Sequence, residues 1–245
     1  MRLTPILLLG LLLAGSAGHA ATGADWLPLE VGSRWTYSTS SDHNYTPPAG
    51  EQLRDFQRSE REELVSGEGP GPGGLGSIYR VQVRAGGRAR PDRYLAADEN
   101  GVAMYAIPDG FVAGWPRFES PPVRLVPASP KPGQTWNAGT LVEGDVRIKL
   151  RGEVLGFEEV EAGGITRYGC LHVRLTGTPY GSTVQSFGRA EVRGGRFRLD
   201  LWLERDVGIV KHLGVTEFRL ELENGQKAIT SSIVTRRLED ATKGD

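Results

Sequence analysis

The stretch Phe197-Arg198-Leu199-Asp200-Leu201-Trp202-Leu203-Glu204 places an apolar side chain at every second position. Successive side chains of a β-strand point to opposite faces of a sheet, so this spacing predicts a strand with one buried and one wet face. Such alternation is typical of antiparallel sheets, because strands of parallel sheets are covered on both faces and have continuous apolar runs. The stretch therefore favours an antiparallel, all-β architecture.

The same alternation recurs along the rest of the chain. The other segments that show it are 79–84, 146–151, 171–176 and 218–223. Glycine-containing turn sequences separate these segments, and Gly194-Gly195 and Asn224-Gly225 each predict a hairpin turn. We expect a single antiparallel curved sheet or β-barrel with very little helix.

One charged segment fits this pattern less well. Residues 56–65 carry many Glu and Arg side chains with few apolar ones. Charged side chains on a strand at the edge of a sheet discourage pairing with other chains. We therefore predict an edge strand from about Phe56 to Val65.

The N-terminus has the features of a secretory signal peptide, predicted over residues 1–20. Arg2 supplies a positive charge, Ile6 to Ala14 is an apolar run, and small residues lead to Ala20. The apolar run is too short for the roughly 20 residues that span a bilayer, so no transmembrane anchor is expected. The prediction is an exported protein, periplasmic or secreted, with residues 21–245 forming a single β domain.

Composition excludes some classes of partner. The chain has 29 Lys and Arg against 30 Asp and Glu, a net charge of −1. This balance provides no basic surface of the kind that binds nucleic acid. Cys170 is the only cysteine, so it cannot form an internal disulfide, and we expect a half-buried small residue there.

Two parts of the chain resemble each other weakly. A proline followed by a glycine and a tryptophan occurs in residues 28–35 and again in 130–136. This suggests two related β-units, about 26–110 and 128–215, that together close one curved sheet or barrel. Chance similarity between ordinary turn sequences is the alternative explanation.

Four segments together resemble a known family of exported bacterial proteins. They are residues 26–37, 125–136, 156–173 and 201–211. Their order and spacing resemble the family described as domain-of-unknown-function 3108-like or TapB-like. The resemblance implies an antiparallel β-barrel or strongly curved sheet in the cell envelope, and it implies no catalytic residues.

Motifs for catalysis or metal binding are not found in the sequence. There is no Gly-x-Ser-x-Gly elbow, no His-Glu-x-x-His and no Cys-x-x-Cys. His172 is predicted on the wet face of its strand, and His212 is predicted at a solvated strand end. We therefore assign no catalytic, cofactor-binding or metal-ligating residue, although a hydrolase built on a dispersed Ser-His-Asp triad stays open.

A basic run and several aromatic residues are the remaining candidates for binding. The run from Arg80 to Arg93 could contact an anionic lipid headgroup or polysaccharide, or could be the polar face of one strand. Large aromatic side chains near turns could instead line an apolar groove, with core packing as the alternative. The candidate ligand-binding residues of this kind are Trp35, Trp115, Phe118, Trp136 and Trp202.

These observations favour a non-catalytic envelope protein that binds an apolar or lipid-like ligand or another envelope protein. Small barrels enclose ligands of this size. The first alternative is a structural or assembly partner without a ligand cavity. The second alternative is a hydrolase.

Overall fold

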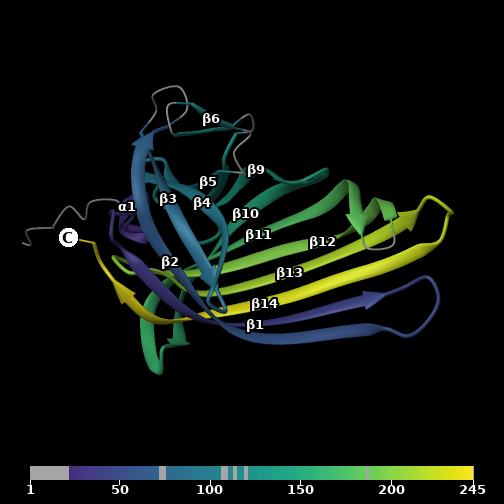
Figure 1. The fold of residues 1–245 in the computed structure, drawn as a ribbon. Helices are drawn as coiled ribbons and strands as arrows, with labels where there is room; N and C mark the ends of the chain where they lie inside the picture. Colours follow the sequence, from purple (N-terminus) through teal and green to yellow (C-terminus); the bar gives the residue numbers. More distant parts are fainter. Residues whose placement is uncertain are drawn as a thin grey trace, which may run out of the picture.

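Most of the sheet prediction is confirmed by a computed structural model. The structure describes residues 22–71, 76–105, 110–112, 115–118, 121–185 and 188–244. Twelve strands form one antiparallel sheet that curls into a nearly closed barrel (Figure 1). The all-β fold with very little helix is therefore confirmed. The predicted signal peptide lies outside the described residues.

The elements follow one another along the chain with short connections. The helix α1 spans Gly23–Trp26. The strands are β1 (Arg34–Thr46), β2 (Leu53–Pro70), β3 (Ser77–Ala85), β4 (Arg88–Asp98), β5 (Gly101–Tyr105), β6 (Gly110–Val112), β7 (Trp115–Arg117), β8 (Val123–Pro127), β9 (Thr135–Glu143), β10 (Val146–Ala162), β11 (Ile165–Gln185), β12 (Gly188–Glu204), β13 (Gly208–Leu222) and β14 (Lys227–Thr242).

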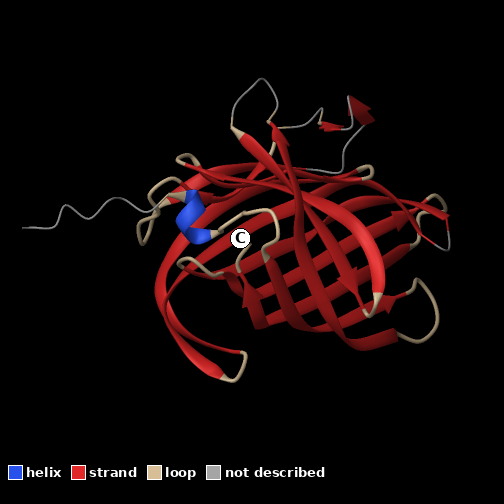
Figure 2. Ribbon diagram, turned by 60° about the vertical axis from the view of Figure 1, so that its left-hand side comes forward, coloured by secondary structure: helices blue, strands red, loops and turns tan. Residues whose placement is uncertain are grey.

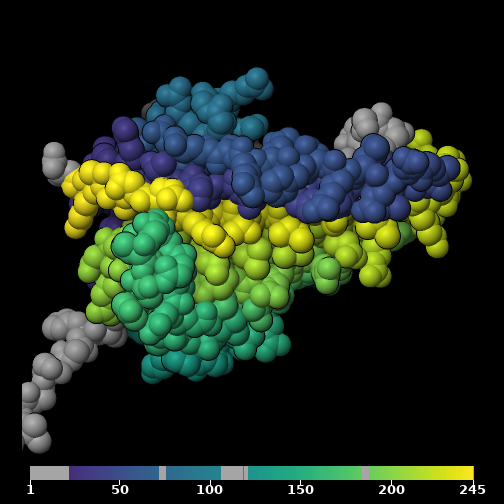
Figure 3. Space-filling view, turned by 90° about the horizontal axis from the view of Figure 1, so that it is seen from below, coloured from purple at the N-terminus to yellow at the C-terminus, as the bar shows by residue number. Residues whose placement is uncertain are grey.

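Strands that are consecutive in the chain are mostly neighbours in the barrel. The order around it is β8-β5-β4-β3-β2-β1-β14-β13-β12-β11-β10-β9, and β6 and β7 form a separate two-stranded sheet. The C-terminal strand β14 pairs with β1, and Figure 3 shows it in yellow against the purple and blue N-terminal strands. The predicted repeat units stay a prediction, and their boundary at residue 215 falls inside β13.

The two ends of the sheet, β8 and β9, meet at a place that we call the seam. The indole Nε1 of Trp136 on β9 donates a hydrogen bond of 3.0 Å to the carbonyl oxygen of Arg124 on β8. A Cβ atom added to Gly139 on β9 would lie 3.3 Å from the carbonyl oxygen of Pro122. Backbone and indole contacts therefore bring the sheet ends together.

One predicted hairpin is confirmed and the other is wrong. Asn224-Gly225 joins β13 to β14, with Gly225 at a φ of 78°. Gly194-Gly195 makes no turn, because β12 continues through both residues with a bulge in its pairing to β13. A Cβ on Gly195 would lie 1.9 Å from the carbonyl oxygen of Glu217, so these glycines permit a close approach of two strands.

The predicted edge strand is partly correct. Residues 56–65 lie within β2, which pairs with β1 from Leu53 to Leu64 but with β3 only from Arg61 onward, so among the described residues 56–59 have a strand neighbour on one side only. Arg61 and Glu63 are only 9% and 7% exposed, because they point into the barrel and pair with each other. The charges of this segment therefore serve partly as a buried ion pair.

The alternating residues supply the core as predicted. The apolar positions of β10 and β11 that point inward are buried: Val146, Ile148, Leu150, Leu171, Val173 and Leu175. The N-terminal segment covers one end of the barrel, where Trp26 and Leu27 join this core (Figure 2). We call this the α1 end, and the opposite end, where β1 turns into β2, the hairpin end. Within the described ranges, no helix has the length and apolarity to cross a membrane.

Candidate functional site

The barrel interior contains a cavity of about 490 Å³. Ligand-binding cavities typically have volumes of roughly 300–1,000 Å³, so this space is large enough for a small molecule. Its walls come from strands on both sides of the barrel, including β1, β2, β4, β12, β13 and β14. The cavity is the candidate functional site.

An apolar wall forms one part of this cavity. It consists of Leu125, Phe197, Leu199, Leu201, Ile209 and Phe218. Leu199 on β12 faces Gly214 on β13, which has no side chain. At this level β13 contributes only backbone to the wall, and the ring of His212 lies close by, since a Cβ on Gly214 would be 3.2 Å from His212 Nε2.

Charged side chains form another part: Glu63, Arg93 and Arg236 line the cavity, and Arg61 pairs with Glu63. We call these four residues the arginine cluster. Three guanidinium groups converge on a single carboxylate oxygen, Oε1 of Glu63. The distances to it are 2.6 Å from Arg61 Nε, 3.4 Å from Arg93 Nη1 and 4.0 Å from Arg236 Nη1. Three positive charges thus share one negative charge inside the barrel.

The surroundings shift the pKa values of these groups. Burial and the neighbouring Arg93 and Arg61 lower the pKa of Arg236 to about 9. Burial would raise the pKa of Glu63, but the three arginines outweigh it and hold this pKa below its usual value. Burial and repulsion by the other arginines thus act on Arg236, whereas attraction to the arginines acts on Glu63.

Three neighbouring residues present unpaired polar atoms beside the arginine cluster. Thr39, Arg236 and His212 lie side by side across β1, β14 and β13. Thr39 Oγ1, Arg236 Nε and His212 Nδ1 are all buried, and none forms a hydrogen bond with the described residues. Buried polar atoms normally have partners, so this row is unusual.

The prediction that His212 is solvated is wrong. His212 lines the cavity, where burial and then the positive charges of Arg236, Arg93 and Arg61 lower its pKa well below the usual value. The ring is therefore neutral at pH 7. Sequence position alone suggested a strand end, whereas β13 extends in both directions past this residue.

The predicted ligand-binding tryptophans lie apart from one another. Trp35 is buried at the α1 end, and its Nε1 donates a 2.6 Å hydrogen bond to the carbonyl oxygen of Val207. Trp136 lies at the seam, against Gly152 of β10. Both tryptophans make contacts that hold strands together, and neither is among the residues that line the described cavity.

Phe118 and Trp115 belong to the segment next to β8. The ring of Phe118 packs against Tyr94 and Tyr105, with ring centres 5.3 Å and 4.8 Å apart. Trp115 begins β7, and its side chain lies outside the described part of the structure. A ligand-binding role for the five aromatic residues stays a prediction, since the structure does not bring them into one groove.

Trp202 belongs to a polar cluster on the outer face of the barrel wall. Its ring stacks on His172 with centres 4.2 Å apart, and Lys211 Nζ lies 4.4 Å from its centre on the same face of the sheet. Trp202 Nε1 donates a 2.8 Å hydrogen bond to Glu158. His172 lies on the outer face of its strand, as predicted, but the tryptophan covers it and leaves it only 5% exposed.

His172 links two carboxylates on neighbouring strands. Its Nδ1 lies 2.7 Å from Glu158 on β10, and its Nε2 lies 3.0 Å from Asp200 on β12. Asp200 is fully buried and also accepts hydrogen bonds from Arg174 and Arg198. Burial would raise the pKa of Asp200, but these hydrogen bonds outweigh it and hold the pKa well below its usual value.

This outer cluster is better explained as a clamp than as a catalytic site. Both ring nitrogens of His172 already have carboxylate partners, so neither is free to bind a metal or take a proton from a substrate. The contacts tie β10, β11 and β12 together. Among the described residues, no group of three His, Cys, Asp or Glu side chains is arranged to hold a metal ion.

Cys170 is more deeply buried than predicted. It has no measurable exposure, and burial followed by the charge of Glu204 raises the pKa of its thiol to about 11. The thiolate is the reactive form of cysteine, so this residue is poorly suited to nucleophilic chemistry at neutral pH.

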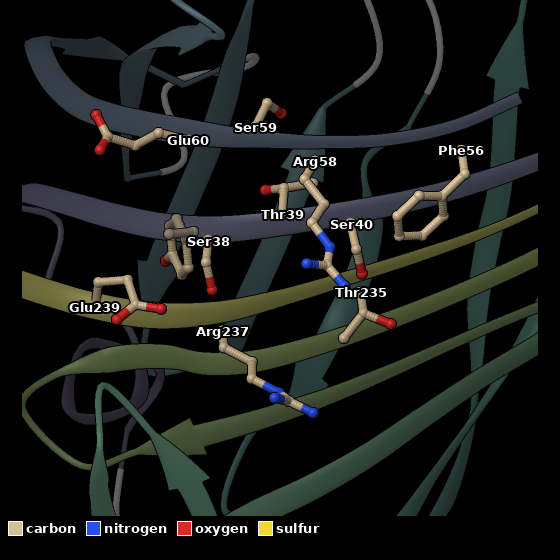
Figure 4. A pocket seen from close by; sticks show the side chains of 11 residues that line it. Ser38, Thr39, Ser40, Phe56, Arg58, Ser59, Glu60, Thr235, Arg237 and Glu239 are labelled. Atoms are coloured by element: carbon tan, nitrogen blue, oxygen red, sulfur yellow. The ribbon is translucent and has the colours of Figure 1, made fainter.

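A second hollow lies on the outer surface of β2, β1 and β14. It has a volume of about 720 Å³ and is shown in Figure 4. Hydroxyl groups such as Ser40 and Thr235 form its floor, and charged side chains such as Arg58, Arg237 and Glu239 surround them. Tyr37 and Phe56 are the large aromatic side chains that line it, fewer apolar groups than line the barrel interior, so it offers an apolar ligand less.

Several residues of the cavity could have been found from the sequence. Arg236 follows Val234 and precedes Leu238 at the same alternating positions, which places a charge on the apolar face of β14. Glu63 stands in the same relation to Val65 on β2. A charged residue on the buried face of a strand is a signal that reading only the apolar residues overlooks.

Comparisons with known proteins give little further information. No protein-family model matches the chain, and no curated protein matches it. One solved structure that resembles it is a candidate lipoprotein from Parabacteroides distasonis, with a TM-score of 0.40 and 11% sequence identity over 89% of this chain and 98% of that chain. A likeness at this level does not assign a function.

Proposed function

We propose that this protein is a non-catalytic binding protein of the bacterial cell envelope that takes an apolar or lipid-like molecule into its barrel. The observation that carries the proposal is the cavity of about 490 Å³ with an apolar wall. Export to the periplasm, or secretion, is inferred from the predicted signal peptide and from the family resemblance.

The apolar wall provides the driving force for such binding. Removing apolar surface from water stabilises a complex by about 25 cal/mol for each Å². Phe197, Leu199 and Phe218 are only partly buried by the protein itself, although they face the interior. A hydrocarbon chain beside them would complete their burial.

Fluorescence titration with N-phenyl-naphthylamine, a neutral apolar probe, tests this function. We expect saturable binding to the purified protein with one probe per chain. Leu199→Trp and Gly214→Leu each add bulk to the cavity and should weaken binding about tenfold, which corresponds to about 1.4 kcal/mol. Ser40→Trp changes the outer hollow instead and should leave the affinity unchanged.

The same titration can also contradict binding in the barrel interior. Circular dichroism and thermal unfolding establish whether each variant keeps the fold, and two filling variants are used because one alone could unfold. Undiminished binding in either folded variant, or loss of binding only in Ser40→Trp, would contradict the interior as the site.

The alternative function is that of an assembly partner that binds no ligand, and exposed apolar side chains on the outer surface favour it. Phe56 and Ile233 are 53% and 45% exposed on the outer surface and flank Asp42 in the sheet register. In that case Phe56→Ser combined with Ile233→Ser would abolish crosslinking to an envelope protein while leaving probe binding intact.

A further inference from the structure

We propose that the ligand is an amphiphilic anion whose carboxylate or phosphate group lies against Arg93 and Arg236, with its hydrocarbon chain against Phe197 and Phe218. The inference rests on the proposed function and names the chemical class of its ligand. It is carried by the charge balance of the arginine cluster, by unpaired polar atoms and by the direction of the cavity.

The charge balance favours a negative ligand. Glu63 is the single carboxylate shared by Arg61, Arg93 and Arg236. Placing uncompensated charges in a poorly solvated interior costs free energy unless an opposite charge neutralises them. An anion would relieve the mutual repulsion of the guanidinium groups, whereas a cation would increase it.

The unpaired atoms supply hydrogen bonds of the right kind. Arg236 lines the cavity, and its Nε is a donor. A neutral His212 with its proton on Nδ1 is a second donor that lines the cavity. Oxygen atoms of a carboxylate or phosphate accept such bonds, and bonds to charged oxygens are the stronger ones.

The order of residues along the barrel gives the ligand a direction. His212 and Arg236 lie nearer the α1 end, which the N-terminal segment covers, while Phe218 lies near the hairpin end. The distance from His212 to Phe218 along the strand is about 20 Å at roughly 3.3 Å per residue. The charged group therefore lies deep, and the chain extends toward the hairpin end.

Glu143 agrees with this orientation. It is the other acidic residue that lines the cavity, and it is exposed at the end of β9, beside the turn into β10. Its charge would repel an anionic group at that end of the cavity. The two acidic residues thus differ, since Glu63 is surrounded by arginines and Glu143 faces water.

A matched pair of probes tests the inference. Dansyl-undecanoic acid and its primary amide have the same chain and differ in charge. We expect the purified protein to bind the acid about tenfold more tightly than the amide at pH 7, as for other charge-assisted hydrogen bonds. Arg236→Met and Arg93→Met should each remove this preference by weakening binding of the acid to the level of the amide.

The control is Arg237→Met, which removes the neighbouring arginine on the outer face of β14 and should leave both affinities unchanged. Equal binding of the acid and the amide by the unaltered protein would overturn the anionic ligand but not the proposed function. Failure of both probes to bind would overturn both. Displacement of the acid by millimolar inorganic phosphate would overturn the amphiphile, because a free anion would then suffice.

Discussion

At the scale of single residues, the interior of the barrel owes its character to a few charged groups on otherwise apolar strand faces. Arg236 and Glu63 occupy positions where the alternation alone predicts aliphatic side chains. They keep the interior polar at one level of the barrel, and they place His212 beside positive charges. The properties of the cavity therefore depend on side chains that contribute little to the fold.

His212 gives this level of the barrel a measurable pH dependence. Because its pKa in the folded protein is well below the usual value, the unfolded chain binds a proton more readily below about pH 6.5. The stability contributed by the neutral ring is thus present above pH 6.5 and is lost as the pH falls. The free energy of unfolding should decrease by up to about 1.4 kcal/mol for each pH unit below that value.

Urea unfolding at pH 7 and pH 5 measures this effect. We expect His212→Gln to lessen the decrease, whereas His43→Gln, at an exposed position, should leave it unchanged. The carboxylates with lowered pKa values, including Asp200, titrate at more acidic pH and contribute little in this interval. An identical decrease in the unaltered protein and His212→Gln would refute the assignment.

At the scale of elements, the sequence predicts strands well and their neighbours less well. The alternation in 146–151 and 171–176 correctly identifies the inward faces of β10 and β11, because side-chain direction is a local property. Gly194-Gly195 misleads because glycine serves equally in a turn and where two strands approach closely. Whether residues 56–65 lie at an edge depends on pairing between distant segments, which no local pattern records.

The candidate site likewise has features that the sequence predicts and features that depend on contacts between distant strands. The sequence predicts an apolar cavity in a barrel as one possibility, and the structure contains a cavity, but the aromatic residues proposed for it lie elsewhere. Trp35 and Trp136 make long-range contacts with Val207 and Arg124 that depend on closure of the barrel. The row of Thr39, Arg236 and His212 comes from three strands, so its assembly could not be predicted from spacing.

The seam is a contact between strands that a single substitution can disturb. A Cβ added to Gly152 would lie 2.1 Å from the Trp136 ring, which must then move away from Arg124. We expect Gly152→Ala to lower the free energy of unfolding by about 1–3 kcal/mol, as for other overpacked sites.

A double-mutant cycle isolates this contact. In a Trp136→Ala background the space beside residue 152 is open, so Gly152→Ala should cost much less there. Denaturant unfolding of the four proteins gives the coupling free energy. An equal cost in both backgrounds would show that the indole does not determine the effect.

At the scale of the whole molecule, the barrel combines a covered end with an interior that is only partly filled. The chain follows an up-and-down path around the barrel, so β14 returns to β1 and the two sheet ends meet at the seam. The α1 end is filled by Trp26, Leu27 and Trp35, and the cavity lies between this packed end and the hairpin end. This arrangement is what the proposed uptake of an amphiphile requires.

Native mass spectrometry of the purified protein, titrated with dodecanoate, tests the central claim most directly. The account predicts that the mass increases by one dodecanoate per chain and that Gly214→Leu, folded but with a filled cavity, keeps its bare mass. A bare mass for the unaltered protein at every ligand concentration, or the same uptake in both proteins, would contradict it.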